Sequence, residues 1–181
     1  MVSMTTSNDV ALGGLDTPVG HITVAVTSTG LARVSWARRH VAGAALPAAG
    51  DQARVRAVTT QLAAYFRGEL RAFDLPLDWR FVSGTARVVL QTLHATVGYG
   101  RSVTYGELAE RSGTSVPARG IGAVMGSNPL PVVVPCHRVL AHDGLGGYSG
   151  GDGTNGLEVK RWLLTLEGVL PPTFDWSPDH L

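Results

Sequence analysis

The 181-residue sequence contains a single cysteine, Cys136, which excludes an internal disulfide. A chain without disulfides is typical of a reducing compartment, so we expect a cytoplasmic protein. The first ten residues, MVSMTTSNDV, hold neither a basic stretch nor an apolar run, and they predict no secretory signal. No uninterrupted run of about 18 apolar residues is present, so the sequence predicts no membrane partner.

Charge is also scarce, because only 16% of the residues are charged and the formal net charge is +1. This balance neither requires nor excludes a nucleic-acid partner, but the charges are unevenly distributed. Residues 81–140 hold five arginines and two glutamates, whereas two basic residues face six acidic ones from residue 141 onward. The middle of the chain is therefore where a polyanion is expected to bind. The hydrophobic fraction of 44% is that of an ordinary globular protein.

The first part of the chain has the pattern of an α+β unit, predicted over residues 1–80. Residues 10–37 are rich in β-branched residues that alternate with polar ones, as in HITVAV and LARVSW, and predict strands. After an Ala/Gly/Pro-rich stretch at 41–50, apolar residues recur at helical spacing, with Asp51 as the expected N-cap and Gly68 as the expected end. These apolar residues are Val55, Val58, Leu62 and Phe66. The segment FDLPLDW, residues 73–79, is predicted to be a last edge strand.

Residues 81–181 have a different, mainly helical pattern. A helix is predicted over 85–97, and Thr104 with Glu107 forms a capping-box pair that opens a short helix ending at Gly113. A second helix begins near Ala118 and ends before Asn128, so the two form a candidate helix-turn-helix. A glycine-rich loop at 141–156 and a last helix follow.

Three glycines in GIGAVMG, residues 120–126, invite comparison with a nucleotide-binding loop. Their spacing misses the dinucleotide fingerprint and no strand precedes them, so we predict no nucleotide cofactor. We interpret them as positions of close approach on a helix. The six histidines show no metal-ligand spacing, and we predict no metal.

The cysteine stands beside a histidine in VVVPCHRVL, residues 132–140. Only a thiolate is a good nucleophile, and a histidine backed by a carboxylate is able to take the thiol proton. In an extended segment the side chains of Cys136 and His137 point to opposite sides, which favours a bridging water over direct contact. From these residues alone, a small buried core cysteine remains the alternative.

The motifs around this cysteine resemble the O6-alkylguanine-DNA alkyltransferase family. The similarity is carried by SNPLPVVV, PCHRV, GGYSGG and LLTLEG, and it extends more weakly through AYFRGEL, FDLPLD and TPVG. The resemblance implies an α+β fold with an N-terminal antiparallel sheet and helix, ribonuclease-H-like, and a C-terminal helical, winged-helix-like domain carrying the helix-turn-helix. It also implies single-turnover transfer of the O6-alkyl group of a flipped guanine in double-stranded DNA to the cysteine.

By this resemblance, the site residues have separate roles. Cys136 is the alkyl acceptor, His137 its base through a water, and Glu167 the group that orients the imidazole. Asn128 positions the cysteine loop, Tyr105 contacts the flipped base, and Arg119 fills the vacated base stack. The small residues Ala118 and Gly122 let the second helix approach DNA. The pocket is completed by Tyr148, Ser149, Pro131, Met125 and the carbonyl of Val139. The resemblance implies a monomer without a cofactor.

The sequence departs from the family pattern in two places. Thr85, Val88 and Gln91 replace characteristic residues of the helix at 85–97, which puts the packing between the domains in doubt. Residues 152–156, DGTNG, lengthen the loop near the pocket. Two alternatives therefore stay open: a protein that binds alkylated bases without repairing them, and an enzyme of this fold redirected to a small-molecule substrate. A cysteine protease is excluded, because such enzymes bring the base and the nucleophile together from distant segments.

Overall fold

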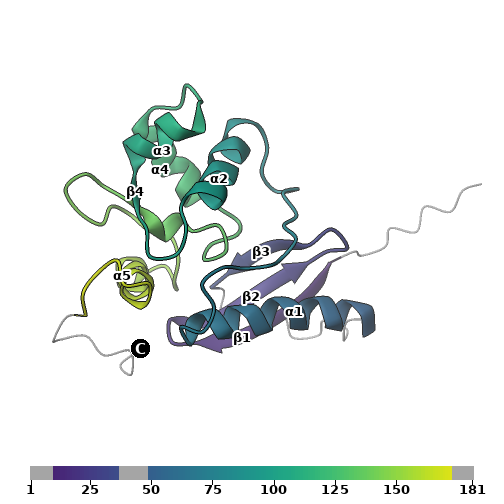
Figure 1. Ribbon diagram of the computed structural model, residues 1–181. Helices are drawn as coiled ribbons and strands as arrows, with labels where there is room; N and C mark the ends of the chain where they lie inside the picture. The colour runs from purple at the N-terminus through teal and green to yellow at the C-terminus, as the bar shows by residue number, and fades with distance from the viewer. Residues whose placement is uncertain (1–9, 37–48, 173–181) are drawn as a thin grey trace, which may run out of the picture.

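The computed structural model describes residues 10–36 and 49–172, which form two packed units (Figure 1). The N-terminal unit is a three-stranded antiparallel sheet in the order β1-β2-β3, with the long helix α1 across one face. Its elements are β1 (Ala11–Thr17), β2 (Gly20–Val26), β3 (Leu31–Ser35) and α1 (Ala49–Phe66). The strands and helix predicted from the hydrophobic pattern are therefore present, whereas most of the predicted linker at 41–50 lies outside the described residues.

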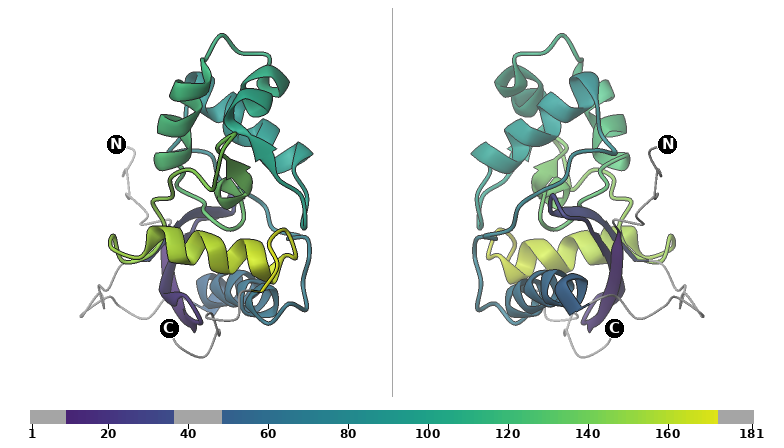
Figure 2. Two further views of the ribbon diagram at one scale, coloured as in Figure 1. Left: turned by 90° about the vertical axis from the view of Figure 1, so that its left-hand side faces the viewer. Right: turned by 90° about the vertical axis from the view of Figure 1, so that its right-hand side faces the viewer.

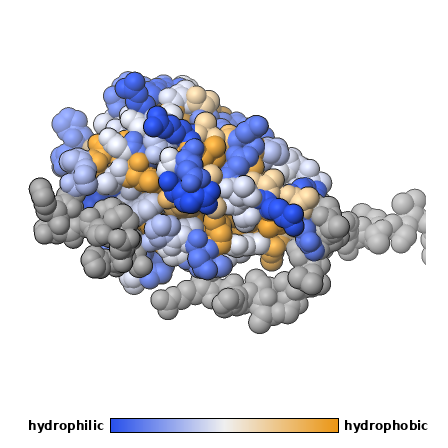
Figure 3. All heavy atoms as spheres, turned by 60° about the horizontal axis from the view of Figure 1, so that its bottom comes forward, coloured by the Kyte–Doolittle hydropathy of each residue, from blue (hydrophilic) through white to orange (hydrophobic). Residues whose placement is uncertain are grey.

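The N-terminal core is formed by alternate residues of the sheet and by one face of α1. Ile22, Val24 and Val26 of β2 are buried on one face, as strand alternation requires. In α1, Val58, Leu62, Tyr65 and Phe66 are buried at helical spacing, and exposed polar residues of this helix face outward. Figure 3 shows that the lower surface of the molecule is mostly hydrophilic, with scattered apolar groups.

Two predictions for this unit were wrong in detail. Asp51 is not the N-cap, because α1 begins at Ala49; Asp51 lies in the first turn and pairs with Arg54. The segment 73–79 forms a single bridge, Leu77 to Leu31, instead of a strand. Pro76 has no N–H to extend a ladder, and the edge contact is limited to Leu31 N–H donating to the Pro76 carbonyl and Asp78 N–H donating to the Leu31 carbonyl.

The C-terminal unit consists of short helices around a two-stranded pairing. Its elements are α2 (Gly84–Thr96), β4 (Val103–Thr104), α3 (Tyr105–Ser112), α4 (Ala118–Gly126), the 3₁₀ turn η1 (Cys136–Arg138), β5 (Val139–Leu140) and α5 (Gly156–Leu166). The capping box predicted for α3 is present, with Thr104 and Glu107 each accepting from the other's backbone N–H. Gly113 ends α3 in the left-handed conformation, as predicted. Helices α3 and α4 form the predicted helix-turn-helix.

Helix α5 lies beside α1, so α5 joins the two units (Figure 2). The rings of Phe66 and Trp162 pack 5.8 Å apart between these helices. A second contact joins the two units: the N–H of Val34 in β3 donates to the carbonyl of Pro129, at 2.8 Å. The loop that leads to Cys136 is therefore fixed against the N-terminal sheet. Within the described ranges, none of the helices has the length and apolarity needed to cross a membrane.

Candidate active site

The loop before Cys136 is held by the side chain of Asn128. Its amide nitrogen donates to the carbonyl of Val134 at 2.8 Å, and its amide oxygen accepts from the N–H of Leu130 at 3.0 Å. One side chain thus satisfies the backbone on both sides of a buried turn. The Asn128 side chain therefore bridges this turn.

Cys136 and His137 lie in a 3₁₀ turn instead of the extended segment expected from the sequence. Pro135 precedes this turn, and the N–H of Arg138 donates back to the Pro135 carbonyl at 2.9 Å. The local geometry therefore places the two side chains by a turn and not by strand alternation. Both side chains are buried, and His137 is fully so.

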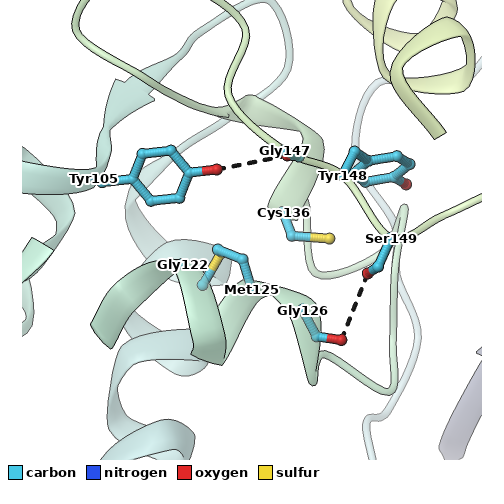
Figure 4. Close-up of a pocket in the computed structure, with 8 residues that line it drawn as sticks. All are labelled: Tyr105, Gly122, Met125, Gly126, Cys136, Gly147, Tyr148 and Ser149. Atoms are coloured by element: carbon cyan, nitrogen blue, oxygen red, sulfur yellow. Dashed lines mark hydrogen bonds between the residues drawn. The ribbon is translucent and has the colours of Figure 1, made fainter. Parts of the chain in front are cut away.

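The thiol opens into a cavity of about 320 Å³ (Figure 4). Tyr105 and Tyr148 lie on either side of Cys136, Met125 lies below it, and Ser149 lies close to the sulfur side (Figure 4). The lining residues are Tyr105, Gly122, Met125, Gly126, Cys136, Gly147, Tyr148 and Ser149. A partly open cavity with two aromatic walls and both polar and apolar lining suits a planar heterocycle.

Burial raises the pKa of the Cys136 thiol, while the Asn128 amide and the positive charge of Lys160 oppose that rise. The thiol is therefore protonated at neutral pH, since desolvation disfavours the thiolate. Nucleophilic chemistry at this sulfur requires a base.

His137 is the candidate for that base. Its Nε2 lies 2.9 Å from Oε1 of Glu167. Because an ionised carboxylate only accepts hydrogen bonds, Nε2 carries the proton and Nδ1 is left with a free lone pair. Nδ1 is buried and has no hydrogen-bond partner among the described residues. Burial also lowers the pKa of His137, which keeps the imidazole neutral and able to accept a proton near neutral pH.

Glu167 receives donors from three residues. Arg138 donates from Nε to Oε2 at 2.8 Å and from Nη2 to Oε1 at 2.9 Å, and the hydroxyl of Tyr65 donates to Oε1 at 2.6 Å. The hydrogen bonds from His137 and Arg138 outweigh burial and lower the pKa of Glu167 to about 2. The carboxylate is therefore a permanent negative charge that can stabilise an imidazolium.

Lys160 is a further site residue that sequence reasoning missed. It is fully buried on α5, and its Nζ donates to the carbonyls of Val139 at 2.7 Å and Gly147 at 3.0 Å. Burial lowers its pKa to about 8. A sequence signal existed, because Lys160, Leu164 and Glu167 recur at helical spacing on the buried face of α5.

The structure brings five of the predicted pocket and contact residues to the thiol, whereas two predicted pocket residues, Val139 and Pro131, do not line its cavity. Tyr105, Tyr148, Ser149, Met125 and Gly122 line the cavity with Cys136. Val139 is buried and does not line this cavity, and its carbonyl accepts from Lys160. Pro131 lines an adjoining cavity of about 280 Å³ that also touches Cys136 and includes Trp36 of the N-terminal unit. The thiol thus lies between two spaces.

One face of helix α4 is exposed to solvent and carries small side chains beside Arg119. Ala118 and Arg119 are exposed and Gly122 is half-buried, while Ile121 and Met125 point into the core. Arg119 and Ala118 line a surface cavity together with Tyr105 of α3. Tyr105 lines both this surface cavity and the thiol cavity, so the exposed arginine lies near the pocket.

The two departures from the family pattern lie away from the thiol chemistry. Thr85 and Val88 are exposed on α2, with Val88 44% exposed, and Gln91 is half-buried. The helix instead buries Val89, Leu90 and Leu93. Thr85 and Val88 therefore do not weaken packing between the units. The added loop is tied locally, since Asp152 accepts from Thr154 and Asn155 accepts from the Asp152 N–H.

Comparison with known proteins agrees with this arrangement. Residues 11–79 match the ribonuclease-like domain, and residues 85–169 the DNA-binding domain, of 6-O-methylguanine DNA methyltransferase. A methylated-DNA–protein-cysteine methyltransferase of Mycobacterium tuberculosis is 36% identical over 159 residues, 87% of this chain and 92% of that protein. A protein of the same name from Mus musculus is 41% identical over 117 residues, 61% of this chain and 54% of that one.

Solved structures give the same result for the fold. The crystal structure of M. tuberculosis O6-methylguanine methyltransferase superposes with a TM-score of 0.73 at 33% identity, covering 92% of this chain and 98% of that one. M. tuberculosis OGT in complex with DNA gives a TM-score of 0.71 at 35% identity, covering 86% and 91%.

The fold and site together define a helix-turn-helix protein with one enclosed thiol backed by a histidine and a glutamate. More specifically, the chain belongs to the 6-O-methylguanine DNA methyltransferase family.

Proposed function

We propose that this protein repairs DNA by direct reversal, moving the O6-alkyl group of a guanine in double-stranded DNA onto Cys136. The observation that carries the proposal is the position of the only cysteine: its thiol lies in an aromatic-walled cavity that opens beside the exposed face of α4. Family membership, and a relative solved in complex with DNA, support the same assignment.

The first step is deprotonation of the thiol. The Cys136 proton passes through a water to Nδ1 of His137, the buried nitrogen that has a free lone pair. The resulting imidazolium is stabilised by the ionised Glu167, 2.9 Å from Nε2. A thiolate formed inside a buried pocket is poorly solvated and therefore reactive.

The second step is in-line displacement at the alkyl carbon. The sulfur of Cys136 forms a bond to this carbon while its bond to O6 breaks, and the electron pair passes to the guanine. The guanine anion then takes a proton, leaving ordinary guanine in DNA and a thioether on the protein. We assign hydrogen-bond donation to the leaving base to Tyr105 and Ser149, which both line the cavity. Because the thioether is stable, each molecule acts once.

Access to the pocket requires the base to leave the duplex. Flipping costs a few kcal/mol, and less for a damaged base that pairs poorly. We assign insertion into the vacated stack to Arg119, and close approach to the DNA backbone to Ala118 and Gly122. The side chains of Ala118 and Arg119 are exposed on α4, as this role needs.

The experiment is to mix the protein with a duplex that contains one O6-methylguanine and to measure the guanine restored in the digested DNA. We expect restoration to stop at one guanine per protein molecule, and Cys136→Ala to bind the duplex without restoring any. Binding without restoration by the unaltered protein would identify a protein that only marks alkylated bases. Neither binding nor restoration would indicate a redirected substrate.

We further propose that the protein works as a cytoplasmic monomer, with a domain boundary near Arg80. A cysteine that must stay a free thiol requires a reducing compartment, which supports the location. The change from a sheet-and-helix unit to short helices after residue 80 supports the boundary.

A further inference from the structure

Tyr65 connects the N-terminal unit directly to the proposed catalytic carboxylate. It lies near the end of α1 and is only 1% exposed. Its hydroxyl donates to Oε1 of Glu167 at 2.6 Å, and the same oxygen accepts from Nε2 of His137 at 2.9 Å. Together with Nη2 of Arg138, three donors therefore share this carboxylate oxygen, and Tyr65 is the one from the N-terminal unit.

We propose that Tyr65 is a positioning residue for alkyl transfer, which holds Glu167 in place and sets how strongly that carboxylate attracts the imidazole of His137. In this account the N-terminal unit completes the set of groups that activates the thiol. The inference rests on the proposed alkyl transfer, but the link from Tyr65 to His137 can be measured without it.

The position of the Tyr65 ring is fixed by aromatic packing. Its centroid lies 5.4 Å from Phe66, 5.3 Å from Phe73 and 6.2 Å from Tyr99. This packing orients the hydroxyl toward Glu167 at little further cost in side-chain entropy. Replacement by phenylalanine keeps the ring and its neighbours and removes only the hydroxyl oxygen.

Other ionisable groups also act on the Glu167–His137 pair, and each comes from a different element. Arg138 of η1 donates twice to Glu167, and the charges of Arg138 and of Lys160 on α5 lower the pKa of His137. Tyr99, after α2, and Tyr148, in the loop before α5, lie within the electrostatic range of Glu167. Tyr65 is the phenol that donates directly to the carboxylate.

Removal of the Tyr65 hydroxyl is expected to change the pKa of His137 in one direction. A donor on Oε1 neutralises part of the carboxylate charge, and its removal leaves Glu167 a stronger partner for an imidazolium. The pKa of His137, which burial lowers, should therefore rise in Tyr65→Phe. Since only neutral imidazole accepts the thiol proton, the acid limb of the rate profile should move to higher pH.

The test is the pH dependence of single-turnover transfer from an O6-methylguanine duplex, between about pH 5 and pH 8, for the unaltered protein, Tyr65→Phe and Tyr99→Phe. Tyr99 is a matched control, because its hydroxyl donates to the backbone carbonyl of Leu166 at 2.9 Å and not to the carboxylate. The titration of His137 is followed in parallel by NMR of labelled imidazole, with His137→Gln for assignment.

We expect Tyr65→Phe to move both the acid limb and the His137 titration upward by about half a pKa unit or more, and to slow transfer roughly threefold to tenfold. Tyr99→Phe should leave both curves in place. An unchanged His137 titration in folded Tyr65→Phe, or an equal shift in both variants, would overturn the inference. A shifted titration in a protein without transfer would keep the Tyr65 link and refute the proposed function instead.

Discussion

At the scale of single residues, Glu167 has the most demanding role in the site. Its buried carboxylate accepts from His137, Arg138 and Tyr65, so its charge is matched by donors on every side. A buried carboxylate is retained only with such partners, because desolvation alone would neutralise it. The same arrangement that keeps the imidazole oriented therefore also contributes to folding.

This role predicts acid sensitivity of the fold. The pKa of Glu167 is about 2 in the folded protein and about 4.5 when unfolded, so its ionised form favours folding. The stabilisation is complete above pH 4.5 and is lost as pH falls toward 2, a total of about 3 kcal/mol. Denaturant unfolding at a series of pH values should show this loss in the unaltered protein.

Glu167→Gln should lower the stability at neutral pH by a similar amount and should lose less on acidification. Glu158→Gln is the control, since that carboxylate is exposed on the same helix. Equal slopes against pH for the unaltered protein and Glu167→Gln would show that this carboxylate does not stabilise the fold through its charge.

The residues of the site were easier to predict from the sequence than the residues that they contact. Cys136, His137 and Glu167 carry a recognisable motif, and the structure brings the last two together. Tyr65 lies within AYFRGEL, but its contact with the site was not predicted, because a buried aromatic residue in a helix is indistinguishable from core until the fold brings it to residue 167. Lys160 was overlooked because a lysine in an amphipathic helix is usually exposed, and only its spacing to Leu164 and Glu167 indicated burial.

At the scale of elements, the short helices begin and end where local chemistry dictates. Thr104 and Glu107 satisfy each other's backbone N–H at the start of α3, and Gly113 ends it. Such signals are local and were therefore predicted from sequence. Asp51 lies in the first turn of α1, a position that the sequence pattern did not distinguish from an N-cap, and the prediction for 73–79 did not allow for the missing N–H of Pro76.

The capping box also positions the pocket, because Tyr105 is the first residue of α3. Thr104→Ala removes the acceptor for the Glu107 N–H and should cost about 1 kcal/mol of unfolding free energy. Thr96→Ala is the control, as its hydroxyl only bonds back to Thr92 within α2. Urea unfolding measures both. A loss no greater in Thr104→Ala than in Thr96→Ala would argue against the cap.

Helix α4 carries the prediction that separates base flipping from chemistry. Arg119→Ala should slow transfer from duplex DNA by roughly tenfold, since the vacated stack is then unfilled. Transfer from the free O6-methylguanine base should change little, because no flipping is needed. Single-turnover rates with both substrates measure the difference. Arg56 is an exposed arginine on α1, so Arg56→Ala controls for the loss of a positive charge. Equal slowing with both substrates would place Arg119 in the chemistry instead.

At the scale of the whole molecule, the thiol pocket depends on both units. The loop before Cys136 is hydrogen-bonded to Val34 of β3. Glu167, at the end of α5, is hydrogen-bonded to Tyr65 of α1. The sequence did not predict this connection between the units, because it arises from contacts between residues as far apart as 65 and 167. The N-terminal unit is therefore part of the site's architecture.

The most direct test of the central claim is to find where the alkyl group goes. The protein is reacted with a duplex whose single O6-methylguanine bears a deuterated methyl group, and its tryptic peptides are sequenced by mass spectrometry. We predict one deuterated methyl per molecule, on Cys136 in the peptide spanning residues 120–138. A label on another residue, or an unlabelled Cys136 in protein that has consumed the lesion, would contradict the account.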